Sequence, residues 1–145
     1  MNKKKTLEQL ENARRAHIKW LNRAKSMIDG GFRVRDPHPL ASTACKFGLW
    51  FNSEGVNLFN SLQIEGIETI HRVHDQLHDK YVAIYEIYFG SAKGIVYDSK
   101  VTLEKRTISK ETEETAKQYF VELKSLSYTM LEELERLEKH IHSLS

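Results

Sequence analysis

Three of the seven histidines of this 145-residue chain, His71, His74 and His78, lie within the nine-residue segment 70–78. His74 and His78 are four residues apart, so on an α-helix their side chains share one face, one turn apart. Two imidazoles placed in this way can bind one metal ion. They also fall on an apolar stripe expected to face a core, where a polar group without a partner costs about 1–3 kcal/mol.

His17 and the single cysteine, Cys45, are the remaining candidate ligands. His17 occupies one slot in the apolar stripe of an expected first helix, and Cys45 lies on an expected short helix further along the chain. If the first and third helices pack side by side, three imidazoles meet inside the protein and Cys45 could supply a fourth ligand. Three nitrogens and one thiolate suit Zn²⁺, which favours tetrahedral N/S coordination at about 2.0–2.3 Å. Magnesium and calcium prefer oxygen ligands.

Each of these residues also has a simpler interpretation. A histidine buried among helices is more often a hydrogen-bonded core residue than a ligand, and Cys45 without a metal is an ordinary small buried residue. His71 lies one turn from His74 and competes with it as a ligand. Trp20 and Trp50 are expected to pack around the site rather than to bind a ligand. Only the combination of residues points to a metal.

The elements that position these residues begin with a long amphipathic helix. The spacing of Thr6 and Gln9 predicts a capping box at the start of this helix, and Gly30 and Gly31 are expected to end the helix. Residues 33–39 then form a connector containing two prolines.

A short helix is expected to begin near residues 40–42 and to carry Cys45. Gly48 is unfavourable inside a helix, which indicates close packing against a neighbour. We expect the helix to end at Asn52–Gly55, with one further helical turn at residues 57–62.

A third long helix is predicted from about Glu65 to Phe89, ending at Gly90. Residues 91–108 form a loop or a short extended piece. The extended piece would contain Val96, Tyr97, Val101 and Leu103. Ser109 then caps a last helix over about residues 109–143. The expected fold is all-α, a four-helix bundle of three long helices and one short helix that carries Cys45.

Composition excludes several classes of protein. The length favours a single domain over residues 1–145, and the formal charge of +2 is too small to indicate nucleic-acid binding. No apolar run approaches the roughly 20 residues that cross a bilayer, and the first residues do not resemble a signal peptide. One cysteine cannot form an internal disulfide. We therefore expect a cytoplasmic protein that acts without membrane or nucleic acid.

The same residues resemble a known family. Ala16-His17-Ile18-Lys19-Trp20-Leu21, then Cys45-Lys46-Phe47-Gly48-Leu49-Trp50, then His74 and His78 are similar to the chemoreceptor zinc-binding (CZB) domain. That family has a histidine shortly before a tryptophan, a Cys-x-Phe-Gly-x-Trp motif and a later His-x-x-x-His. The resemblance runs from about His17 to Tyr81, within a family-like core of about residues 14–90.

The resemblance implies a helical bundle that binds zinc through His17, Cys45, His74 and His78. Family members usually regulate an attached chemoreceptor signalling domain or diguanylate cyclase, in response to zinc or to oxidants such as hypochlorous acid. Because no output domain is expected within this chain, the implied role is a stand-alone zinc-binding sensory domain. It would be a homodimer that signals to a separate protein of a chemoreceptor or diguanylate cyclase pathway.

Two other functions remain open from the sequence. One is a helical interaction protein whose zinc is purely structural. The other is a di-iron enzyme, which requires Glu-x-x-His pairs on facing helices; Glu68 and His71 provide the spacing once, but no glutamate precedes His17 by three residues. A zinc site closed by four protein ligands leaves no position for substrate or water, so no enzymatic activity is expected.

Overall fold

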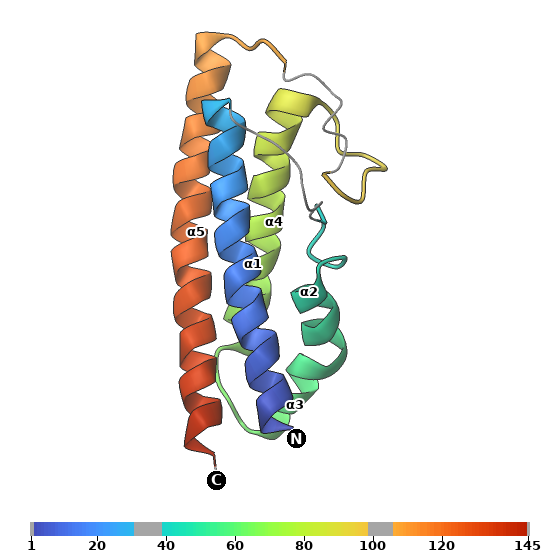
Figure 1. Cartoon of the computed structure of the whole chain (residues 1–145), viewed down its shortest axis with the longest axis vertical. Helices are drawn as coiled ribbons and strands as arrows, with labels where there is room; N and C mark the ends of the chain where they lie inside the picture. The colour runs from blue at the N-terminus through green and yellow to red at the C-terminus, as the bar shows by residue number, and fades with distance from the viewer. Residues whose placement is uncertain (1, 31–38, 99–105, 145) are drawn as a thin grey trace.

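Three long helices run along the length of the molecule (Figure 1). The structure is a computed structural model that describes residues 2–30, 39–98 and 106–144. The elements are α1 (Lys3–Asp29), α2 (Lys46–Trp50), the π-helical turn η1 (Phe51–Gly55), α3 (Val56–Ser61), α4 (Ile67–Phe89) and α5 (Lys110–Ser143). No strand is assigned within the described ranges, so the predicted all-α class is confirmed.

The three long helices pack on one another because each buries a stripe at helical spacing. α1 contacts both α4 and α5, and α4 contacts α5, while α2 packs on α1 and α3 packs on α4. The centre of the core contains large side chains that are less than 2% exposed: Tyr81, Tyr85, Tyr88, Phe51, Phe59, Leu10, Met27, Ile70, Leu77, Ile84, Leu123 and Met130. The three tyrosines of α4, Tyr81, Tyr85 and Tyr88, therefore belong to the core.

The start of α1 differs from the prediction. Asn2, rather than Thr6, is the N-cap, and its Oδ1 accepts a hydrogen bond from the amide of Lys5 at 3.1 Å. Thr6 is buried in the first turn, and its hydroxyl donates to the carbonyl of Asn2. The prediction failed because Asn2 is an equally good cap, and the lysines that follow it favour a helix.

The segment from α2 to α3 also corrects a prediction. The short helix begins later than expected, at Lys46, and it does not end at Asn52–Gly55. The backbone stays right-handed through η1 and continues into α3. The hydroxyl of Ser53 donates to the carbonyl of Leu49 at 2.6 Å, so a residue expected to break the helix stabilises the wide turn instead.

The remaining elements follow the prediction closely. α4 ends before Gly90, and α5 begins after Ser109, whose hydroxyl oxygen accepts from the amide of Thr112. Of the uncertain stretch 91–108, Tyr97 forms an isolated antiparallel bridge with Pro39. Other expectations lie outside the described residues: those for residues 33–38 of the connector and for Val101 and Leu103.

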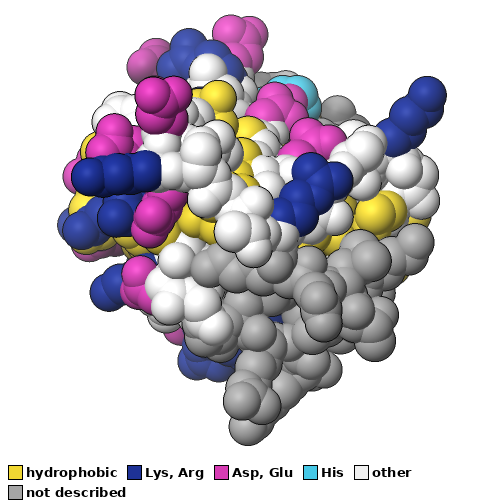
Figure 2. All heavy atoms as spheres, turned by 90° about the horizontal axis from the view of Figure 1, so that it is seen from above, with side chains coloured by type: hydrophobic (Ala, Val, Ile, Leu, Met, Phe, Trp, Pro, Cys, Tyr) yellow, Lys and Arg dark blue, Asp and Glu magenta, His cyan; other side chains and the backbone are white. Residues whose placement is uncertain are grey.

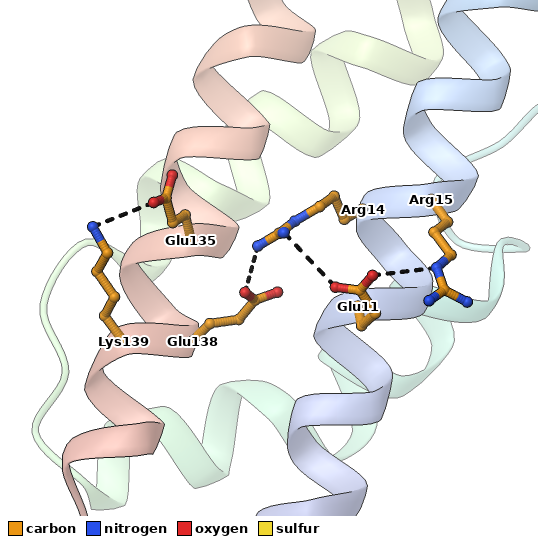
Figure 3. Close-up of polar contacts among 6 residues, drawn as sticks. All are labelled: Glu11, Arg14, Arg15, Glu135, Glu138 and Lys139. Atoms are coloured by element: carbon orange, nitrogen blue, oxygen red, sulfur yellow. Dashed lines mark hydrogen bonds and ion pairs between the residues drawn. The ribbon is translucent and has the colours of Figure 1, made fainter.

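Charged side chains join α1 to α5 along the surface. Arg14 pairs with Glu138 across the two helices, and the same guanidinium lies 3.8 Å from Glu11 (Figure 3). On the end of the molecule seen in Figure 2, acidic and basic side chains are interspersed. Within the described part of the chain, no helix combines the length and apolar character needed to span a membrane.

We predict that Leu134→Ala lowers the free energy of unfolding by about 2–5 kcal/mol, because it leaves a cavity where α5 packs on its neighbours. Leu134 is fully buried, whereas Val121 on the same helix is 59% exposed. Val121→Ala is the control and should change stability by less than about 0.5 kcal/mol. Urea denaturation measures both, and equal effects would contradict the described burial of α5.

Candidate metal centre

Three histidines from two helices meet in the core. His17 comes from α1, and His74 and His78 come from successive turns of α4; their exposed fractions are 5%, 3% and 2%. One ring nitrogen of each lies within 4.8 Å of the others. The ring centroids are 5.2 Å apart for His17 and His74, and 4.7 Å apart for His74 and His78. The expected meeting of three imidazoles is therefore present.

Backbone carbonyls orient two of the three rings. His17 Nδ1 lies 2.6 Å from the carbonyl oxygen of Ala13, and His78 Nδ1 lies 3.0 Å from that of Leu40. A carbonyl can only accept, so each Nδ1 carries a proton, and the lone pair of the neutral ring is then on Nε2. Histidines that bind metals commonly donate their other ring N–H to a carbonyl in this way. The arrangement therefore fits a metal at the Nε2 side of both rings.

Cys45 lies beside this cluster at the N-cap of α2. Its Sγ is 3.2 Å from Nε2 of His74 and accepts a hydrogen bond from the amide of Gly48, also at 3.2 Å. Nitrogen and sulfur ligands of one tetrahedral zinc ion are about 3.5 Å apart, given the usual bond lengths. The Cys45–His74 pair is thus spaced as two ligands of one ion would be.

The electrostatics of the site favour a neutral imidazole and a protonated thiol when no metal is bound. Burial, followed by repulsion from His17 and His78, lowers the pKa of His74 to about 2, so its ring is neutral at pH 7. Burial raises the pKa of the Cys45 thiol, although the amides of Gly48 and Phe47 partly oppose this change. A bound dication would reverse the balance at Cys45, because a coordinated thiol is deprotonated.

Gly48 allows the cysteine loop to approach α4. A Cβ added to Gly48 would lie 1.8 Å from the carbonyl oxygen of Ser42 and 3.2 Å from Cε1 of His74. The close packing expected at Gly48 is therefore confirmed. The hydroxyl of Ser42 donates to Asp75 at 2.5 Å, which ties the same loop to α4.

Aromatic rings enclose the cluster. Trp20 is 4% exposed, and its ring centroid is 4.0 Å from that of His78. Trp20 also stacks on Tyr81: the two ring centroids are 4.3 Å apart, and the angle between the ring planes is 4°. Phe47 packs edge-to-face against both His17 and His74. These rings keep water from the imidazoles, as expected for Trp20, whereas Trp50 is only partly buried.

The competing residues lie outside the cluster. His71 is 52% exposed, and its Nδ1 is 3.5 Å from the carboxylate of Asp75. Glu68 is also exposed, and the group of converging ligand atoms among the described residues contains no carboxylate. A di-iron site needs several inward glutamates, so the geometry does not favour that alternative.

Several supporting groups were not predicted from the sequence. The carbonyls of Ala13 and Leu40 carry no side-chain signal, so no residue pattern could have revealed them. A buried network of Arg23, Tyr81 and Asp98 was also missed. Its members are 17 to 75 residues apart, and each alone resembles an ordinary surface or core residue.

We predict that Gly48→Ala weakens zinc binding by about 10–100-fold, because the added methyl group forces the Ser42–Cys45 loop away from His74. Gly55→Ala is the matched control. A Cβ there would meet only side-chain atoms of Trp50 and Phe51, at 3.0 Å or more. Competition with a chelator of known affinity measures both variants, and an unchanged affinity for Gly48→Ala would refute this role of Gly48.

Comparison with known proteins agrees with the site. Residues 17–85 match the family model described as the chemoreceptor zinc-binding domain, CZB, a segment that contains the three histidines and Cys45. No curated protein and no solved structure gave a significant match to the chain. The resemblance noted in the sequence is thereby confirmed: the match over residues 17–85 is consistent with a member of the chemoreceptor zinc-binding domain family.

Proposed function

We propose that this chain is a zinc-binding regulatory domain in which His17, Cys45, His74 and His78 hold one zinc ion inside a four-helix bundle. One observation carries the proposal: three buried imidazole nitrogens lie within 4.8 Å of one another, and the sulfur of Cys45 is 3.2 Å from His74. α2, η1 and α3 would together form the fourth helix of the bundle. The whole of residues 1–145 would be one domain around this site.

The ligands come from three separate parts of the chain, and this gives the metal its structural effect. α1 supplies His17, α4 supplies His74 and His78, and the start of α2 supplies Cys45. Zinc, when bound, supplies the positive charge that keeps Cys45 as a thiolate. The carbonyls of Ala13 and Leu40 hold two rings in the tautomer that carries its proton on Nδ1.

Oxidation of Cys45 would be the input that alters the site. Hypochlorous acid takes two electrons from the thiolate sulfur, which gains an oxygen and becomes a sulfenic acid, while the oxidant leaves as chloride. A sulfenic acid is a poorer ligand than a thiolate. Cys45 is also the N-cap of α2, so the change would loosen the start of that helix from α1 and α4. Loss of zinc itself would have the same mechanical effect.

The output would pass to a separate protein. α2 and η1 lie at the side of the three long helices, so a shift of this segment changes the surface that the domain presents (Figure 1). We propose a homodimer whose contacts change with the state of Cys45, and a partner from a chemoreceptor or diguanylate cyclase pathway. The site is proposed to be regulatory rather than catalytic because four protein ligands leave no position for a substrate.

The full chain purified without added metal should contain about one zinc ion per molecule by elemental analysis, as a closed structural-type site does. Cys45→Ala should lose most of this zinc to a competing chelator. His71→Ala is the matched control: it removes a histidine of α4 that lies outside the cluster, and its zinc content should equal that of the wild type. Wild-type protein without zinc would refute the proposal.

Oxidant sensing is tested with Cys45→Asp. Aspartate can ligate zinc and can cap α2, but it has no sulfur to oxidise. Stoichiometric hypochlorous acid should release zinc from the wild type and add one oxygen to Cys45, detected by mass spectrometry. Cys45→Asp should retain its zinc under the same treatment. Equal release from both proteins would exclude Cys45 as the sensing atom.

The competing function, a purely structural zinc site, makes a different prediction for the metal-free protein. If zinc only maintains the fold, chelation should abolish the helical circular dichroism signal. We expect the metal-free protein to keep most of its helicity, because α4 and α5 bury large apolar side chains away from the ligands. Sedimentation velocity would then reveal a changed dimer equilibrium.

A further inference from the structure

The loop after α4 holds the backbone group that orients His78. The amide of Leu40 donates to the carbonyl of Val96 at 2.9 Å, and Tyr97 bridges to Pro39. The carbonyl of the same Leu40 residue lies 3.0 Å from Nδ1 of His78. Residues 95–98, which we call the strap, therefore hold the residue on which the tautomer and orientation of His78 depend.

Asp98 anchors the strap in the protein interior. It is 1% exposed, and its Oδ2 accepts from the Tyr81 hydroxyl at 2.7 Å and from Nη2 of Arg23 at 2.6 Å. Nε of Arg23 donates to the same oxygen at 3.1 Å. Arg23 belongs to α1 and Tyr81 to α4, so a single carboxylate joins the strap to both helices that carry the histidines.

A second route leads from Asp98 to His78 through aromatic rings. Burial, together with the Asp98 carboxylate, raises the pKa of Tyr81 well above its usual value, so its hydroxyl stays protonated and donates to Asp98. The ring of Tyr81 stacks on Trp20, and Trp20 packs on the His78 ring at 4.0 Å. Asp98 thus constrains one face of the His78 ring as well as its Nδ1.

We infer that Asp98 is a positioning residue for His78, acting through the strap and Leu40 on one side and through Tyr81 and Trp20 on the other. The inference rests on the proposed role of His78 as a zinc ligand. Asp98 acts through the neighbours Arg23 and Tyr81, and its effect is to limit the rotation and translation of the imidazole. Such outer contacts commonly change metal affinity by about 10–100-fold.

The test compares zinc release from the full-length wild type, Asp98→Ala and Glu138→Ala, with transfer to a chromophoric chelator as the readout. Asp98→Ala should release zinc about 10-fold faster than the wild type. Glu138→Ala is the matched control, because it breaks the α1–α5 ion pair of Figure 3 and leaves the strap intact. It should lower the thermal midpoint without accelerating release. Equal release from the wild type and a folded Asp98→Ala would overturn the inference.

Cobalt substitution distinguishes positioning from a general loss of stability. Tetrahedral Co²⁺ absorbs visible light much more strongly than five- or six-coordinate Co²⁺, so the spectrum reports the ligand set directly. Asp98→Ala should show weakened visible bands, and Glu138→Ala should keep the wild-type spectrum. A wild-type spectrum for folded Asp98→Ala would count against a positioning role.

Tyr81→Phe tests the positioning role if Asp98→Ala does not fold, because it removes the hydroxyl that donates to Asp98 and keeps the stacked ring. It should release zinc about threefold faster than the wild type, as a milder change to an outer contact. A wild-type rate would overturn the inference. Absence of zinc from the wild type itself would instead refute the proposed function, so the two failures are distinguishable.

Discussion

Three imidazoles and one thiol that are buried together need partners for their polar atoms, and this constraint organises the structure. Each carries polar atoms that cost free energy when they leave water. Two of the rings direct Nδ1 to backbone carbonyls, and one nitrogen of each of the three rings lies within 4.8 Å of the others. Lone pairs that converge in a buried space repel each other, and a dication turns that repulsion into attraction. A bound dication would therefore stabilise the packing of the helices around the cluster.

Because of this constraint, the helices contribute differently to the cluster and to the packing around it. α1 and α4 are long enough to carry the clustered histidines at mid-length and still bury large apolar surfaces elsewhere. α5 contributes no member of the cluster and packs against both of them. The short α2 brings in the cysteine, and Gly48 permits the close approach that this requires. The histidine cluster and much of the apolar packing are thus partly separated in space.

The all-α class and the meeting of the three histidine side chains could be predicted from sequence because helical periodicity is a local signal. His74 and His78 share a face by spacing alone, and an apolar stripe indicates which way that face points. The course of the chain through Asn52–Gly55 could not be predicted, because a π-helical turn and a loop have the same composition of small polar residues. Asp98 was missed for another reason: its partners Arg23 and Tyr81 are distant in sequence, so only the folded chain pairs them.

The hydrogen bond from the Gly48 amide to the Cys45 sulfur has one further consequence. Thiol, thiolate and oxidised sulfur differ in how strongly they accept a hydrogen bond. The electron density on the sulfur therefore affects the amide proton of Gly48 directly. The nuclear magnetic resonance chemical shift of this proton reports the chemical state of Cys45. The backbone itself carries this reporter, so no label is needed at the site.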